Sequence, residues 1–253
     1  MHELNMKDIK PDLRKILVIG HEGVGKTNFI KTMPRPIYIF SFDNGYQTLA
    51  GEDKITVGLC VDEDRYKPHA YLDFTTQFDK LQKGLKYKNT DGTEKPYKTI
   101  AIDSISFLST FLFDHLQRVN NNIDKPGGYG VYGAVKSKLQ DILNKAIIIS
   151  EYVVVTALLD TDKDEDTGEL FFVPSVVGST KNEMGAWFDA VFYMTVDKNP
   201  TTGIKTYKML TVGDRRQKAK LRLPTSLAKL VASSEEPDFQ ALMAKIKPQT
   251  KGA

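Results

Sequence analysis

A short apolar run stands directly before a glycine-rich segment, and this junction constrains the fold more than any other feature. The run reads KILVIG over residues 15–20, and the segment reads GHEGVGKT over residues 20–27. The segment fits the pattern G-x-x-x-x-G-K-[ST], and residues 26–33 are compatible with a helix that Pro34 ends. Such a strand, loop and helix turn consecutive backbone N–H groups toward an anion. The sequence therefore predicts a phosphate-binding loop.

The residue types in this loop indicate a nucleotide bound through its phosphates together with magnesium. Lys26 is expected to reach the β- and γ-phosphates, and the Thr27 hydroxyl to hold Mg²⁺. A chance match to the pattern is the alternative, but the flanking strand and helix argue against it. The predicted nucleotide-binding residues are Gly20, His21, Glu22, Gly23, Val24, Gly25, Lys26, Thr27 and Asn28.

The rest of the chain alternates apolar strands with helices, which indicates an α/β fold. Its 253 residues are 41% hydrophobic and 26% charged, enough for one sizeable core. Expected strands cover residues 36–42, 54–59, 99–103 and 152–158, and expected helices cover 73–88, 104–119, 131–150 and 237–246. We expect a polar turn at 88–95, a hairpin-like strand at 170–174 after the acidic residues 160–169, and an antiparallel hairpin of 190–196 with 204–212. We expect a mainly parallel sheet with helices on both faces, an N-terminal extension at 1–13, one domain at 14–230, and a C-terminal helix and tail at 231–253.

Two carboxylates stand at the ends of expected strands. Asp103 ends the strand TIAID and is expected to hold the shell of the magnesium ion, with Thr27 as the other metal-site residue. Asp43 follows the strand PIYIFSF and is expected to position the attacking water. The structural alternatives are a helix cap for Asp103 and an ordinary turn residue for Asp43.

These motifs resemble those of RecA-like ATPases. The segment GHEGVGKT is similar to the phosphate loop of bacterial RecA, and the resemblance extends weakly over residues 14–224. It is nearest to small phage-encoded ATPases of single-strand annealing and recombination. The resemblance implies ATP hydrolysis by a homo-oligomer, with Asp43 as a shortened counterpart of the catalytic glutamate. It also implies a basic residue acting across the subunit interface, for which Arg215 and Arg216 are the candidates, with a solvated basic loop as the alternative.

The same resemblance implies that single-stranded DNA binds to two loops after the later strands. The segment 118–130 fits the first loop, and its candidate DNA contacts are Arg118, Lys125 and Tyr129, although a plain connecting loop is the alternative. Residues 160–169 occupy the second position and carry six acidic residues against Lys163, a composition that repels phosphate. The basic stretch 205–222, which includes Tyr207, is an alternative DNA surface.

Charge, cysteine content and the N-terminal sequence indicate the cellular compartment. The net charge is +3 and Cys60 is the single cysteine, and residues 1–15 hold no apolar stretch typical of a signal peptide. We therefore expect a cytoplasmic protein that does not bind membranes. The resemblance implies a single-strand-binding or other recombination or replication protein as a partner. Two other functions remain open: a small-molecule or nucleotide kinase, and a nucleotide-gated accessory protein with little hydrolysis.

Overall fold

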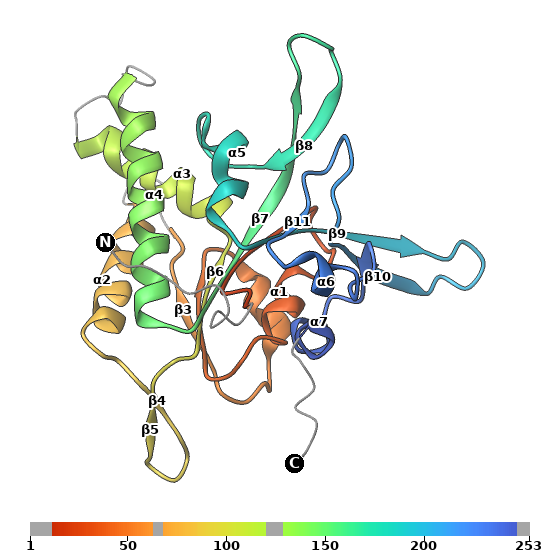
Figure 1. The fold of residues 1–253 in the computed structure, drawn as a ribbon. Coiled ribbons are helices and arrows are strands. Elements are labelled where there is room, and N and C mark those ends of the chain that lie inside the picture. The colour runs from red at the N-terminus through yellow and green to blue at the C-terminus, as the bar shows by residue number, and fades with distance from the viewer. Residues whose placement is uncertain (1–11, 63–67, 120–128, 247–253) are drawn as a thin grey trace.

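The computed structural model describes residues 12–62, 68–119 and 129–246. Its centre is a twisted sheet in the order β12-β10-β9-β1-β7-β6-β2-β3 (Figure 1). Neighbouring strands from β9 to β3 are parallel, whereas β10 and β12 join antiparallel at one end. The strands are β1 (Lys15–Gly20), β2 (Ile37–Ser41), β3 (Ile55–Leu59), β6 (Thr99–Asp103), β7 (Tyr152–Lys163), β9 (Ala190–Lys198), β10 (Lys205–Leu210) and β12 (Ser234–Glu235).

Shorter elements complete the described part of the chain. Antiparallel pairing adds β8 (Leu170–Pro174) to β7 and β11 (Lys220–Leu221) to β9, while β4 (Tyr87–Lys88) and β5 (Glu94–Lys95) form a separate hairpin. The helices are α1 (Lys26–Ile30), α2 (Ala70–Gln82), α3 (Ile105–Val119), α4 (Tyr129–Ile149), α5 (Thr180–Glu183), α6 (Thr225–Ala228) and α7 (Phe239–Ile246), with 3-10 turns η1 (Asn44–Leu49) and η2 (Met184–Trp187). Within these described ranges, no helix is long and apolar enough to cross a membrane.

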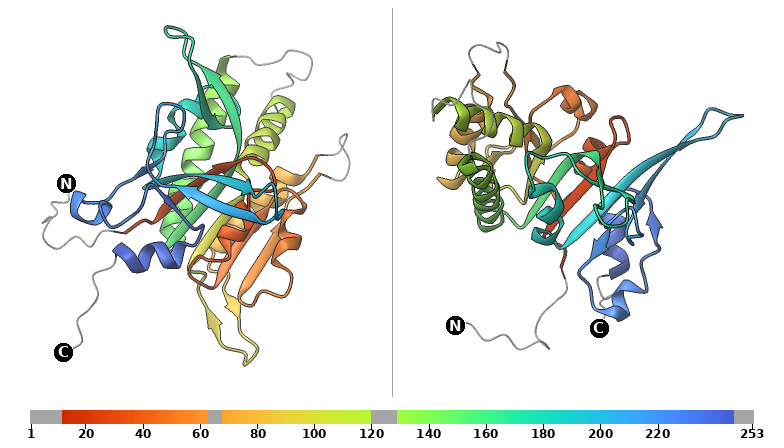
Figure 2. Two further views of the ribbon diagram at one scale, coloured as in Figure 1. Left: turned by 90° about the vertical axis from the view of Figure 1, so that its right-hand side faces the viewer. Right: turned by 90° about the horizontal axis from the view of Figure 1, so that it is seen from above.

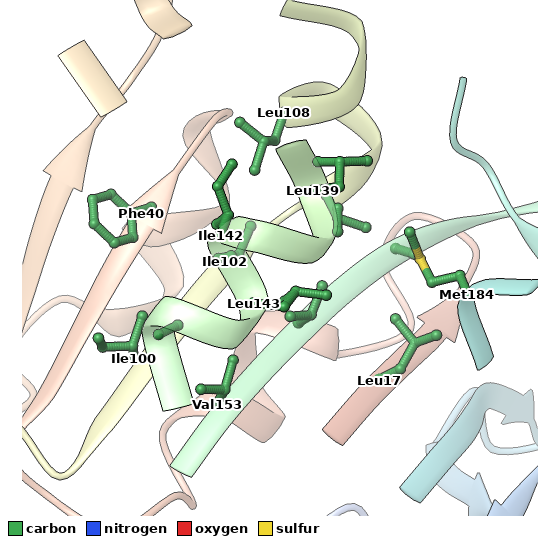
Figure 3. Close-up of a cluster of buried hydrophobic side chains, with 14 of the residues drawn as sticks. Leu17, Phe40, Ile100, Ile102, Leu108, Leu139, Ile142, Leu143, Val153 and Met184 are labelled. Atoms are coloured by element: carbon green, nitrogen blue, oxygen red, sulfur yellow. The ribbon is translucent and has the colours of Figure 1, made fainter. Parts of the chain in front are cut away.

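Alternating strand residues pack in two hydrophobic cores, one on each face of the sheet. On one face, Leu17, Ile102 and Val153 pack with apolar residues of α2, α3 and α4 (Figure 3). On the other face, neighbouring residues such as Ile16 and Val154 pack with α1 and α7. The views in Figure 2 show the helices lying on both sides of the sheet. Successive strand side chains point to opposite faces of the sheet, and both faces are buried. Nearly every position of the central strands is therefore apolar.

The predicted fold class is confirmed, because a mostly parallel sheet lies between helices and the antiparallel β9–β10 hairpin extends from the sheet. Several boundaries were wrong. The β7 strand continues through the acidic residues to Lys163 because it pairs with β8, with Leu159 opposite Pro174 and Lys163 opposite Leu170. Residues 88–95, expected to be a polar turn, include strand residues of the β4–β5 hairpin. The helix α7 contributes Phe239 and Leu242 to the core formed with α1.

Leu143 on α4 lies in the core that α2, α3 and α4 form with the sheet and is 3% exposed (Figure 3), so its contribution to stability can be predicted. Replacing Leu143 with alanine should lower the free energy of unfolding by about 3 kcal/mol, because it removes buried apolar contacts and leaves a cavity. Ile148 lies on the same helix and is 80% exposed, so Ile148→Ala is the matched control and should change the stability by less than about 0.5 kcal/mol. Equal unfolding curves in urea for the two variants would contradict this packing.

Candidate nucleotide-binding site

The glycine-rich loop follows β1 without a break, and two kinds of constraint fix its glycines. A Cβ atom on Gly20 would lie 2.7 Å from Val24 Cγ2 and 2.9 Å from the Met194 carbonyl oxygen, so a side chain has no room there. Gly23 and Gly25 adopt φ angles of +72° and +90°, which side chains of L-amino acids rarely allow. The curled backbone predicted from the sequence is therefore present.

Lys26 begins α1 and points back into the loop. Its Nζ atom donates hydrogen bonds to the carbonyl oxygens of Gly20 at 2.8 Å and His21 at 2.7 Å. An ammonium group has three donors, so one remains for a phosphate oxygen even while both loop bonds are kept. Burial lowers the pKa of Lys26, and the negative charges of Asp103, Asp43 and Glu22 partly oppose that effect.

Asp103 ends β6 and is bound by two threonine hydroxyls. Thr27 donates to its Oδ2 atom at 2.8 Å, and Thr156 donates to its Oδ1 atom. Because β7 lies between β1 and β6 in the sheet, Thr156 on β7 bridges the gap between the glycine-rich loop and Asp103. Asp103 is 3% exposed. Burial raises the pKa of Asp103, the Thr156 and Thr27 hydrogen bonds lower it, the charge of Asp43 raises it and the charge of Lys26 lowers it.

Asp43 lies beside the same cavity and also has a structural role. Its Oδ1 atom accepts a hydrogen bond from the Gly45 amide at 2.7 Å, which caps the 3-10 turn η1. A Cβ atom on Gly45 would lie 2.9 Å from that carboxylate oxygen and 3.2 Å from Thr27 Oγ1. Gly45 therefore lets the Asp43 turn approach Thr27 closely. Sequence reasoning did not select Gly45, although the dipeptide Asn44-Gly45 is a recognisable turn signal.

These groups line one cavity of about 360 Å³ at the carboxyl ends of the strands. Six predicted loop residues line it together with both carboxylates: Glu22, Gly23, Gly25, Lys26, Thr27 and Asn28, with Asp43 and Asp103. The side chain of Val24 is instead buried in the core. Tyr207, considered above only as part of a DNA surface, also lines the cavity, and its Cδ1 atom would lie 3.4 Å from a Cβ on Gly25. The sequence carried no signal for that contact, which joins β10 to the loop.

The remaining predicted residues lie elsewhere or cannot be placed. Arg215 and Arg216 line a separate pocket beside β8, and Arg215 is 3.9 Å from Glu169 in an ion pair. Arg118 lies in the last turn of α3, and Tyr129 begins α4. Lys125 lies outside the described residues. Both arginines are thus absent from the lining of this chain's own nucleotide cavity.

The oxygen atoms of Thr27 and Asp103 fit a magnesium ion, because Mg²⁺ prefers oxygen ligands and usually keeps several waters and nucleotide phosphates as the others. Thr27 would hold the ion through its hydroxyl and Asp103 through a bound water. A bound cation would stabilise the ionised form of the Asp103 carboxylate, which burial disfavours. In the described part of the chain, no group of three or more His, Cys, Asp or Glu residues could hold a metal. This small protein ligand set therefore suits an ion that nucleotide phosphates help to bind.

Comparison with known proteins agrees with this geometry. The family described as AAA domain matches residues 13–223. The chain belongs to the AAA domain family. This AAA domain holds the glycine-rich loop, Asp43 and Asp103, so the prediction of a nucleotide-binding P-loop domain is confirmed at that level.

More distant comparisons add little to the AAA domain assignment. No curated protein matches the sequence. Among solved structures, the assembled ATPase EscN from the enteropathogenic E. coli type III secretion system is similar at 15% identity and a TM-score of 0.44. The match covers 72% of this chain and 43% of the EscN chain, so this AAA domain spans less than half of the EscN length.

Proposed function

We propose that the protein is a Mg²⁺-dependent ATPase of the phage-encoded RecA-like type, which binds single-stranded DNA as a homo-oligomer during recombination or replication. The observation that carries the ATPase is the hydrogen bond of 2.8 Å between Thr27 and Asp103, beside the Lys26 ammonium. It brings a metal-site hydroxyl, a metal-site carboxylate and a phosphate-binding cation to one cavity. The phage origin, the DNA and the oligomer rest on the RecA resemblance.

Each residue of the cavity has its own role in the proposed hydrolysis. Lys26 and the loop amides bind and orient the phosphates, and Asp43 accepts a proton from, and positions, the attacking water. Bound Mg²⁺ supplies charge neutralisation at the phosphate oxygens. Arg215 or Arg216 of a neighbouring subunit would add charge to the transition state, a role suited to a planar guanidinium.

The Asp43 cap also favours a second function. A carboxylate already engaged in capping η1 is compatible with an accessory protein that binds ATP, hydrolyses it slowly and recruits a replication or recombination partner. In that case nucleotide binding changes the surface offered to the partner, and the hydrolysis rate matters little. Single-turnover hydrolysis separates the two functions.

The test compares ATP hydrolysis by the wild type and Asp43→Asn, each with and without single-stranded DNA. Asparagine keeps the capping acceptor for the Gly45 amide but removes the charge, so the fold should be unchanged. We expect DNA to stimulate the wild type and the variant to be about 10²-fold slower, since a positioned base contributes at least that much. A fully active variant would show that Asp43 only caps the turn. A wild type that binds ATP without hydrolysing it would favour the accessory function.

A further inference from the structure

A cleft rich in cationic side chains lies at the amino-terminal ends of the strands, opposite the carboxyl ends that carry the nucleotide cavity. Its volume is about 550 Å³, within the usual range of ligand pockets. Strand ends, the end of α4 and the segment before β6 form its walls. Five cationic residues line the cleft against the single acidic residue Glu151: Arg14, Arg35, Lys54, Lys95 and Lys98.

Only part of this positive charge is neutralised within the chain. Arg35 pairs with Glu52 at 2.6 Å, and Lys54 pairs with Asp53 at 3.7 Å. The Arg14 guanidinium donates to the backbone carbonyl oxygens of Ile147, Ser150 and Glu151, at 3.4, 3.4 and 3.0 Å, at and just after the end of α4. Within the described ranges, Lys95 and Lys98 make no ion pair, and both are exposed. The cleft therefore presents unpaired positive charge to an anionic partner.

The same chain carries a projecting acidic hairpin. The β7–β8 hairpin extends beyond the sheet, and six acidic residues lie on it or at its turn: Asp160, Asp162, Asp164, Glu165, Asp166 and Glu169. Asp162 pairs with Lys181 at 3.2 Å, and Asp164 accepts backbone hydrogen bonds inside the turn. The Glu165 and Asp166 side chains at the tip are exposed and form no ion pair in the described part of the chain.

The hairpin cannot reach the cleft of its own chain. The β7 strand begins at Tyr152, directly after the cleft residue Glu151, and runs for 12 residues to Lys163. At about 3.3 Å per residue this distance is about 36 Å. In Figure 1 the β7–β8 hairpin projects at the top, whereas β5, which ends at the cleft residue Lys95, projects at the bottom. Complementary charge at opposite ends of one molecule suits a head-to-tail contact between two copies.

We propose that the Glu165–Asp166 tip of the β7–β8 hairpin docks into the Lys95–Lys98 cleft of a second copy of this chain. The proposal rests on the oligomer in the proposed function and adds a second contact to it. Arg215 and Arg216 lie beside the hairpin, so this contact is separate from the one that would bring them to a neighbouring nucleotide. A contact between two different surfaces repeats from copy to copy and so builds a ring or a filament. Leu158 of β7 lines the nucleotide cavity and Thr156 of β7 binds Asp103, so the docked hairpin continues directly from the nucleotide site.

Charge reversal tests the contact by sedimentation velocity of the full chain. Lys95→Glu/Lys98→Glu and Glu165→Lys/Asp166→Lys should each weaken self-association by about tenfold or more, because each variant brings like charges together. Mixing the two variants should restore association, since acidic hairpins then meet basic clefts and basic hairpins meet acidic clefts. Raising the salt from about 0.05 M to about 0.5 M should weaken the wild-type association through screening.

A charge control and two further readouts separate this contact from a general effect of net charge or of misfolding. Lys83→Glu/Lys86→Glu changes the net charge equally on an exposed segment after α2 and should leave association unchanged. The melting temperature and ATP hydrolysis of each variant show whether the fold and the proposed ATPase survive. Two monomeric variants that stay monomeric when mixed would overturn the contact, even where hydrolysis is intact. Normal association of Lys95→Glu/Lys98→Glu with lost single-stranded DNA binding would overturn it in favour of a nucleic-acid site.

Discussion

Lys26→Ala is expected to slow ATP hydrolysis about 10³-fold, comparable to losing a preorganised charge at a phosphoryl-transfer site. Nucleotide binding should weaken about 10- to 100-fold, because a charge-assisted hydrogen bond to phosphate contributes about 1.5–3 kcal/mol. Among the described residues, the ammonium donates hydrogen bonds to the Gly20 and His21 carbonyl oxygens, and burial lowers its pKa. The melting temperature without nucleotide should therefore change little.

Titration with a fluorescent ATP analogue and steady-state hydrolysis measure the two effects of Lys26→Ala. Lys83→Ala is the matched control, because this lysine is 75% exposed and pairs with Asp79 on the helix surface. It should bind and hydrolyse ATP as the wild type does. Unchanged ATP affinity in Lys26→Ala would mean that the glycine-rich loop does not hold the phosphates, and the nucleotide site would have to be sought elsewhere.

Asp103→Asn is expected to slow Mg²⁺-dependent hydrolysis about 10³-fold while leaving the fold intact. The amide keeps an oxygen that can accept from one of the two threonine hydroxyls, but it loses the charge that suits a magnesium shell. Burial raises the pKa of the native carboxyl group, which means that the folded state disfavours its charge. The variant without nucleotide should therefore melt at the wild-type temperature or above it.

The decisive measurement for Asp103 is the Mg²⁺ dependence of hydrolysis together with thermal melting. Asp79→Asn, at a carboxylate that is 55% exposed on α2, is the control and should hydrolyse ATP normally. A loss of activity accompanied by a lower melting temperature would point to structural damage. Full activity of Asp103→Asn at every Mg²⁺ concentration would remove Asp103 from the metal site.

The sequence was most informative where chemistry and local geometry coincide. The loop pattern at residues 20–27 required glycines at fixed positions, and the structure shows why for Gly20, Gly23 and Gly25. Asp103 could be selected because it ends a short, continuously apolar run, a pattern typical of a buried parallel strand. Asp43 caps η1 and also lines the nucleotide cavity, so its turn role is present and its role in positioning water stays a prediction.

Residues that join the site through pairing between distant segments were harder to predict. Thr156 lies in the strand expected at residues 152–158, and it is a hydrogen-bond partner of Asp103 because β7 lies between β1 and β6. Tyr207 contacts the loop because β10 pairs with β9, which itself pairs with β1. The strand expected at residues 170–174 is β8, but its pairing also extends β7 into the acidic segment, to Lys163. None of these neighbours is specified by the spacing of residues along the chain.

The sequence by itself determined the phosphate loop, the alternation of strands and helices, and the carboxylates that end two strands. These features depend on local requirements: positive φ angles, the turn after a strand, and the periodicity of apolar side chains. The tertiary structure alone decided the strand order, and with it the contact of Thr156 with Asp103 and the separation of the acidic hairpin from the basic cleft. The physical reason is that strand order depends on the packing of all apolar faces at once, which no local pattern encodes.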